Sequence, residues 1–276
     1  MESKQRGRNG FTEVMMALVA LIFLAPFYFL FANSVKTFGE ILTNAASWPE
    51  KFNWSNYSKA WELARFSEAF QNSVIITVVS VILITLFSAM AAYRMVRSNS
   101  KFNRILLLLF VAAMVVPFQT IMIPVLKVVN TLGVNNSIWG LLLTNLGLSL
   151  PLAVFLFHGF VKSVPLEIEE AATVDGCNPI TVFFRIVLPL LKPMMMTIIV
   201  LNALAIWNDY LLPSLILQKP ELRTIPLATY SFFGQYTKQW DMALPALAIG
   251  ILPIIAFYLL LQRYIVEGIA AGSVKG

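Results

Sequence analysis

Residues 74–93 read VIITVVSVILITLFSAMAAY, a stretch of 20 positions without a single charged side chain. A helix of about 20 apolar residues is long enough to cross the hydrocarbon core of a bilayer. Backbone amides in lipid have no water to bond, so a crossing segment must satisfy them internally, as a helix does. The stretch therefore predicts a membrane-spanning helix, and it sets the fold class for the chain around it.

Five further segments share this length and apolar character, so the sequence predicts an all-α, polytopic membrane protein with six transmembrane helices. The expected spans are 14–32, 74–93, 105–126, 138–161, 194–217 and 243–261. Prolines within the apolar runs predict kinked helices, because neighbouring groups can satisfy the carbonyl that a proline frees. We expect one transmembrane domain over residues 1–276, with a cytoplasmic loop at 162–193.

The composition excludes several other classes of protein. Hydrophobic residues make up 58% of the 276 positions and charged residues only 12%, whereas a soluble domain is about 25% charged. Aromatic residues do not interleave with a basic stripe, which excludes nucleic acid as a partner. The chain has one cysteine, Cys177, and one histidine, His158. We therefore expect no catalytic residue, no metal site and no internal disulfide.

The placement of lysine and arginine predicts the orientation in the membrane. Basic residues crowd the short connections on one side: Lys4, Arg6, Arg8, Arg94, Arg97, Lys101, Arg104, Lys162, Arg185, Lys192, Arg263 and Lys275. Those on the other side are spread over longer loops. Since the denser side is cytoplasmic, we expect both termini and the 162–193 loop to lie in the cytosol of a cell-membrane protein.

The cytoplasmic loop contains a predicted short helix. Pro165 suits the first turn of a helix, where a missing N–H costs nothing, and Gly176 with Pro179 predicts its end. Ile168, Ala171 and Ala172 have the spacing of one helix face. We expect this face to be a shallow surface that a partner's groove can approach.

The string from 170 to 193, EAATVDGCNPITVFFRIVLPLLKP, resembles the EAA motif of ABC-transporter permeases. The resemblance implies a type I importer fold and a coupling helix that docks into a cleft of a cytoplasmic ATPase. The positions that match the motif, and to which the coupling role is carried over, are Glu170, Ala171, Ala172, Asp175, Gly176, Ile186 and Pro189. Cys177 stands where alanine is commoner in the family.

Nearly the whole chain is similar to maltose-type sugar permeases, in particular to the shorter, second permease subunit. The similar segments are PFYFLFANSVK at 26–36, Phe70 with Asn72 and Ser73, WNDY at 207–210, and the tail from Arg263 to Gly276. In this tail the resemblance implies that Gly272, Ser273 and Lys275 contact the ATPases. The outer loop 213–241 is expected to touch a substrate-binding protein.

The resemblance implies a permease subunit of an ATP-driven, binding-protein-dependent importer of sugars, of di- or oligosaccharide size. Its partners would be a second, homologous permease in a heterodimer, two ATPase subunits, a sugar-binding protein and membrane lipid. The chain has no GxxxxGK(S/T) loop to cradle phosphates. ATP and Mg would therefore bind to the partner ATPases, and no cofactor to this chain.

Two questions stay open at this point. Trp207, Asn208, Asp209 and Tyr210 interrupt the fifth span; a buried ionisable group there predicts either a substrate path or contacts between helices. The cargo could also be another polar solute such as glycerol phosphate. A more distant alternative is a passive channel or membrane scaffold, which would need no ATPase.

Overall fold

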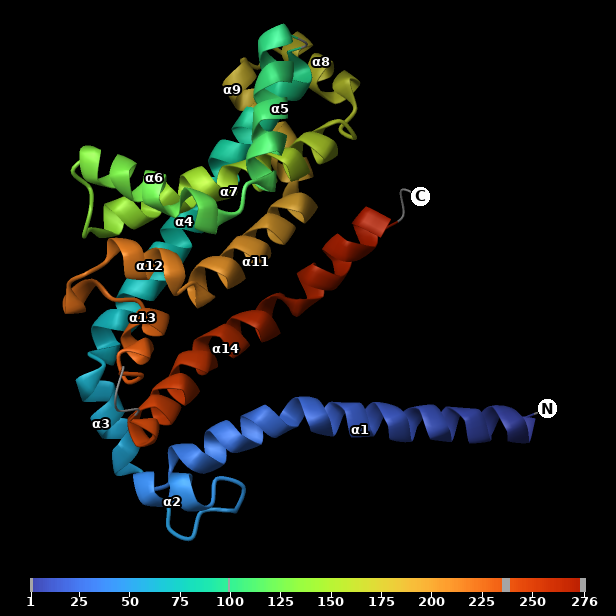
Figure 1. The fold of residues 1–276 in the computed structure, drawn as a ribbon. Helices are drawn as coiled ribbons and strands as arrows, with labels where there is room; N and C mark the ends of the chain where they lie inside the picture. The colour runs from blue at the N-terminus through green and yellow to red at the C-terminus, as the bar shows by residue number, and fades with distance from the viewer. Residues whose placement is uncertain (1, 99, 235–238, 274–276) are drawn as a thin grey trace. The chain divides into compact units, whose positions relative to one another are not determined.

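The computed structural model describes residues 2–98, 100–234 and 239–273, which form helices joined by short connections (Figure 1). The chain divides into two compact units: Met1–Ser67 with Ala228–Pro253, and Glu68–Leu227 with Ile254–Gly276. The helices are α1 (Glu2–Ser34), α2 (Phe38–Thr43), α3 (Ser55–Leu63), α4 (Phe66–Arg97), α5 (Lys101–Val115), α6 (Phe118–Thr131), α7 (Ile138–Val161), α8 (Leu166–Val174), α9 (Pro179–Val182), the π-helix η1 (Phe183–Val187), α10 (Leu188–Leu190), α11 (Lys192–Asn208), α12 (Leu211–Ile216), the 3-10 helix η2 (Pro220–Leu222), α13 (Ile225–Tyr230) and α14 (Trp240–Ser273).

Four of the described helices are long and apolar enough to cross a membrane. They are Thr12–Ser34, Phe66–Arg97, Ile138–Val161 and Trp240–Leu259, and the number rises to six if each of two bent helix pairs is one span. The first, second, fourth and sixth predicted spans are thus confirmed as helices. The predicted bounds of the fourth span, 138–161, coincide with those of α7.

The third predicted span, 105–126, is wrong as one continuous helix. The chain turns by 113° between α5 and α6. Val116 takes an extended conformation, with ψ at 116°, and Pro117 precedes the first residue of α6. A proline disfavours helical geometry in the residue before it and has no N–H to donate, so the first helix stops here.

The fifth predicted span, 194–217, is interrupted where the polar residues predicted it. Helix α11 ends at Asn208 and α12 begins at Leu211. A second bend of 75° precedes this span, between Pro179–Leu190 and α11. The segment that follows α8 therefore meets the transmembrane helix at a sharp corner.

The core of the second unit is built from α4, α7 and the segment from α9 to α11. Small side chains are buried in it: Ala89 and Ala92 on α4 and Ala153 on α7. Lipid tails are as apolar as leucine, so membrane helices associate through close packing, which small residues permit. Asn145 of α7 also donates a hydrogen bond to Ser80 of α4, at 3.4 Å.

The first unit holds a buried lysine in the loop after α1. Lys36 is 1% exposed, and its Nζ donates to the carbonyl oxygens of Asn44 (3.0 Å), Ala45 (3.4 Å) and Ser47 (2.6 Å). Asn56 of α3 donates to the carbonyls of Ser34 and Lys36, on either side of Val35. These bonds fix the loop against the end of α1 and the start of α3.

Aromatic side chains cover the same loop. Tyr28, Trp48, Phe52, Trp54 and Tyr57 follow one another at ring-centroid distances of 5.9 to 6.3 Å. Three of them, Trp48, Phe52 and Trp54, are at least half exposed. Such rings favour the boundary between lipid and water.

Candidate functional site

The predicted helix of the 162–193 loop is α8, and it begins directly after Pro165. Glu167 and Glu169 lie in its first turn, where negative charge is favoured by the helix dipole. At its other end the N–H of Gly176 bonds the carbonyl of Thr173, and the N–H of Cys177 bonds that of Ala172. Gly176 has φ +84°, a conformation that a side chain strains. This is a Schellman ending, so Gly176 is needed for its backbone.

Glu169 attaches α8 to α4 through side-chain hydrogen bonds. It is 6% exposed, and both of its carboxylate oxygens are bonded by residues of α4. Arg97 approaches Oε1 through Nε at 2.8 Å and Nη2 at 2.6 Å, and the hydroxyl of Tyr93 donates to Oε2 at 2.8 Å. We call these three residues the α4–α8 anchor.

Arg97 and Tyr93 also reach the segments on either side of α8. The Nη2 of Arg97 donates to the carbonyl of Val164, in the connection from α7, at 2.9 Å. The ring of Tyr93 lies 5.1 Å from that of Phe183, in η1. Helix α4 therefore contacts the segment before α8, α8 itself and the segment after it.

The anchor was missed by the sequence reasoning. Its signals were present: two adjacent acids at 169 and 170, and a tyrosine and an arginine four positions apart at the end of a predicted span. The spacing of Tyr93 and Arg97 is that of neighbours on one helix face. What no local pattern shows is that this face meets Glu169, 72 residues beyond Arg97.

The predicted common face of Ile168, Ala171 and Ala172 is wrong at one position. Ala172 is 7% exposed and belongs to the buried core, together with Glu169 one turn before it. Ile168, Glu170 and Ala171 are exposed, as are Asp175 and Gly176. The core-facing side of α8 is thus set by 169 and 172, and the remaining motif residues of α8 point away from it.

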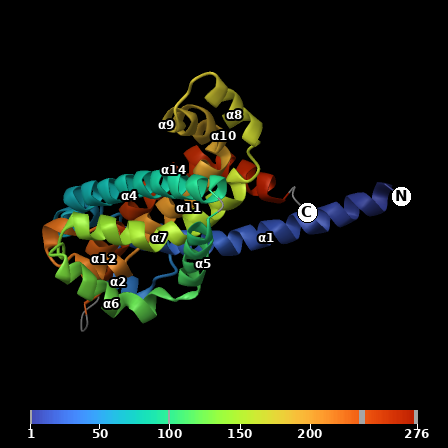
Figure 2. The same ribbon diagram turned by 90° about the horizontal axis from the view of Figure 1, so that it is seen from above.

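The last two motif positions lie in the segment from η1 to α10, which leads to α11. Ile186 is within η1 and is partly buried against the core, whereas Pro189 is exposed in α10. Pro189 has no N–H and its ring crowds the carbonyl of the residue four positions earlier. The wider π-turn of η1, which directly precedes α10, relieves that conflict. Figure 2 shows α8, α9 and α10 grouped at one end of this unit.

The four polar and aromatic residues of the fifth span lie at the break between α11 and α12. Asp209 accepts hydrogen bonds from the N–H groups of Leu211 (2.9 Å) and Leu212 (3.3 Å), so it caps α12. Asn208 bonds the carbonyl of Leu204 in its own helix. Trp207 is 9% exposed, with its ring edge-on to Phe70 at 6.3 Å. Tyr210 is partly buried.

Side chains of α4 and of the turn before α7 hold the loop that follows α12. Asn72 donates to the carbonyls of Glu221 and Arg223, and Ser73 accepts from the N–H of Ile225. Asn136 accepts from the N–H groups of Gln218 and Lys219, at 3.0 and 3.1 Å. The residues that resembled the family at 72 and 73 therefore hold residues 221–225, within the predicted outer loop 213–241.

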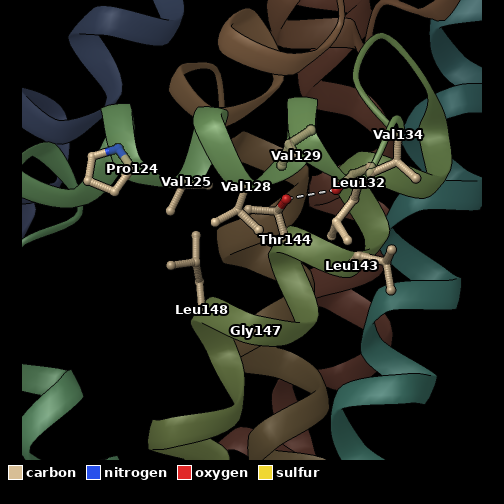
Figure 3. Close-up of a pocket in the computed structure, with 11 residues that line it drawn as sticks. Pro124, Val125, Val128, Val129, Leu132, Val134, Leu143, Thr144, Gly147 and Leu148 are labelled. Carbon is tan, nitrogen blue, oxygen red and sulfur yellow. Dashed lines mark hydrogen bonds between the residues drawn. The ribbon is translucent and has the colours of Figure 1, made fainter.

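A cavity of about 340 Å³ lies between α6 and α7 (Figure 3). Its walls are almost wholly apolar, with Val125, Val128, Leu143 and Leu148 around it. The one hydroxyl, that of Thr144, already donates to the carbonyl of Gly140 at 2.7 Å. A polyol would find no free hydrogen-bonding group in this lining, so the cavity does not suit a sugar.

The predicted tail contacts are only partly within the described residues. Gly272 and Ser273 are the final residues of α14 that the structure describes, and Lys275 lies outside them. Among the described residues, no group of three or more His, Cys, Asp or Glu could hold a metal ion.

The chain is similar to a known family of membrane transport components and to individual permeases. A family model described as "Binding-protein-dependent transport system inner membrane component" matches residues 84–270, which include α8 and the C-terminal part of α4. A probable starch degradation products transport system permease of Thermoanaerobacterium thermosulfurigenes is 42% identical over 258 residues, 94% of either chain. A melibiose/raffinose/stachyose import permease of Bacillus subtilis is 35% identical, covering 95% of both chains.

A solved structure has the same fold. It is a bacterial ABC transporter involved in the import of the acidic polysaccharide alginate, and the chain aligns to it with a TM-score of 0.81 at 20% sequence identity. The alignment covers 94% of this chain and 96% of the other.

Proposed function

Because this chain belongs to the family of binding-protein-dependent transport system inner membrane components, we propose that it is the sugar-conducting permease subunit of an ATP-driven importer. The observation that carries the proposal is its identity of 42% and 35%, over nearly full length, to permeases named for starch degradation products and for melibiose, raffinose and stachyose. The cargo class we propose is therefore di- and oligosaccharides.

The partners follow from the same proposal. A second, homologous permease completes the pathway, two cytoplasmic ATPases bind ATP and Mg, and a binding protein delivers the sugar. The excess of basic residues near α8 and both termini supports a cytoplasmic location for them. The tail at Gly272, Ser273 and Lys275 is proposed to contact the ATPases.

Helix α8 is proposed as the coupling helix that the ATPases grip. Apolar side chains on it and just beyond it are exposed: Ile168 by 41%, Val174 by 87% and Ile180 by 71%. Exposed apolar groups outside the hydrocarbon core support a protein partner. With Ala172 turned inward, the surface offered to the ATPase is formed by Ile168, Ala171 and Val174.

The break between α11 and α12 is proposed to line the sugar pathway. Polar groups are costly within a span and face a cavity, the bundle interior or a partner. Asn208 is exposed in this structure and Asp209 and Tyr210 partly so. Aromatic and amide groups suit the apolar and hydroxyl faces of a sugar, which supports this location over the apolar cavity of Figure 3.

Transport by the intact complex tests the function. The chain is purified with the proteins that co-purify with it and placed in liposomes with the binding protein. We expect ATP-dependent uptake of labelled maltotriose or raffinose and none of glycerol 3-phosphate. Conductance or uptake without nucleotide would instead indicate a channel.

Cross-linking tests the docking surface of α8. In a Cys177→Ser background, Ala171→Cys should cross-link to the co-purified ATPase, because residue 171 is exposed. Ala172→Cys is the matched control, since residue 172 is buried in the core. Equal yields at both positions would contradict the assigned face.

A further inference from the structure

Two adjacent acids of α8 have opposite surroundings. Glu170 is exposed, while the carboxylate of Glu169 is buried against α4. Of these two acids, only Glu170 matches the motif to which the resemblance assigns a coupling role. The geometry gives its neighbour a separate task, because Glu169 makes the side-chain bonds that join α8 to a helix far away in sequence.

We propose that Glu169 is the positioning residue through which movement of α8 is transmitted directly to α4. The proposal rests on the proposed function, in which α8 is moved by an ATPase. By chain connection alone, α8 leads to α7 on one side and, through α9 to α10, to α11 on the other. Because of the α4–α8 anchor, α4 must also move when α8 moves, in addition to α7 and α11.

The chemistry of the anchor makes it a stiff joint. Charge-assisted hydrogen bonds are shorter and about twice as strong as neutral ones, and the arginine and the tyrosine together engage both oxygens of Glu169. Separating a buried carboxylate from its cation leaves an uncompensated charge, which is strongly unfavourable. The pair therefore stays together when α8 shifts, and packed helices joined in this way move as a rigid body.

The remaining contacts of Arg97 and Tyr93 make the joint resist rotation as well. Arg97 holds the carbonyl of Val164 before α8, and Tyr93 contacts Phe183 after it. A single contact would let α8 pivot against α4. Contacts before, within and after α8 fix its direction relative to α4.

The experiment uses the complete transporter in liposomes and measures sugar transported per ATP hydrolysed. Glu169→Gln keeps the size and removes the charge. We expect transport per ATP to fall about tenfold, within the range of roughly 5–150-fold typical of coupling between sites. Glu167→Gln is the matched control, since residue 167 is an exposed acid two positions earlier in the same helix. It should leave the ratio unchanged.

A second variant separates positioning from simple stability. Arg97→Met with Glu169→Met removes both charges, so neither charge is left buried without its partner, although Tyr93 and the carbonyl of Val164 each lose a hydrogen bond. If the anchor only stabilised the fold, this double variant would assemble and transport with the normal ratio. We expect the double variant to assemble and to hydrolyse ATP, but to transport less sugar per ATP than the unaltered protein. If Glu169→Gln fails to fold, the double variant provides the test of the positioning role.

Labels on the two helices give a direct readout. Spin labels at Met90→Cys on α4 and Leu166→Cys on α8, in a Cys177→Ser background, should keep one distance with and without ADP–vanadate. In the double methionine variant that distance should change with nucleotide. A normal ratio and a constant distance in the double variant would overturn the inference. Absence of ATP-dependent uptake by the unaltered transporter would instead overturn the proposed function.

Discussion

The two compact units each bury a charged side chain, but they satisfy it in different ways. Lys36 in the first unit bonds carbonyls that lie 8 to 11 residues further along the chain. Glu169 in the second unit is bonded by side chains 72 and 76 residues earlier. The ammonium has three donors and finds three acceptors in its own loop. A buried charge can thus close a loop locally or join helices that are distant in the sequence.

The largest expected effect is at the long-range site. Arg97→Met leaves Glu169 buried without its cation, and we expect a loss of about 3–5 kcal/mol in stability. Thermal unfolding of the purified complex measures it, together with proteolysis of residues 162–178. Arg94→Met is the control, since that arginine is exposed on the same helix. Equal effects at 94 and 97 would contradict the anchor.

The local site should be the next most sensitive. Lys36→Met removes the donor from three carbonyls, and we expect a loss of about 2–3 kcal/mol, since bonds to charged groups exceed neutral ones. The change should be confined to the loop, so hydrogen exchange should rise at 37–47. Lys51→Met removes an exposed lysine of the same loop and should change neither the stability nor the hydrogen exchange at 37–47. Unchanged exchange at 37–47 would show that Lys36 does not hold the loop.

Two tyrosines allow a hydrogen bond to a charged group to be compared with one between neutral groups. Tyr93→Phe keeps the ring against Phe183 and deletes a bond to a carboxylate, which should cost about 1.5–3 kcal/mol. Tyr57→Phe deletes a bond between the hydroxyls of Tyr57 and Ser34, 2.8 Å apart, and should cost about 1 kcal/mol. Thermal unfolding of both variants checks the order, and the reverse order would refute it.

The smallest effect is a pH dependence in the loop of Lys36. The pKa of Glu40 is lowered because the N–H of Thr37 donates to its carboxylate at 2.8 Å, and the hydroxyl of Thr37 does so as well. Because the folded state lowers the pKa of Glu40, its ionised carboxylate stabilises the folded cap of α2 at pH values above the ordinary glutamate pKa of about 4.3. This stabilisation is lost as the pH falls through the lowered pKa.

Hydrogen exchange of α2 at a series of pH values measures this effect. Protection should fall in acid in the unaltered protein. It should not vary with pH in Glu40→Gln, whose amide oxygen can still accept the bond. Acid sensitivity that persists in Glu40→Gln would place its origin elsewhere in the loop.

The amino-acid sequence was sufficient to predict the membrane class, the helical character of the spans and both ends of α7. It also indicated the ends of α8, because Pro165 and Gly176 act on the backbone within a few positions. These features depend on hydropathy, length and backbone geometry, which are local. The same is true of the interruption at Asn208 and Asp209.

Which residue of two similar neighbours is buried depends on packing between helices. Glu169 and Glu170 are alike in sequence, and so are Ala171 and Ala172, yet one of each faces the core. Pro117 was visible, but whether it kinks or breaks a span depends on the packing around it. Lys36 is buried because the loop that follows it folds back and surrounds its ammonium group with carbonyl oxygens. In each case burial depends on contacts with residues in other parts of the fold, which a local sequence pattern does not reveal.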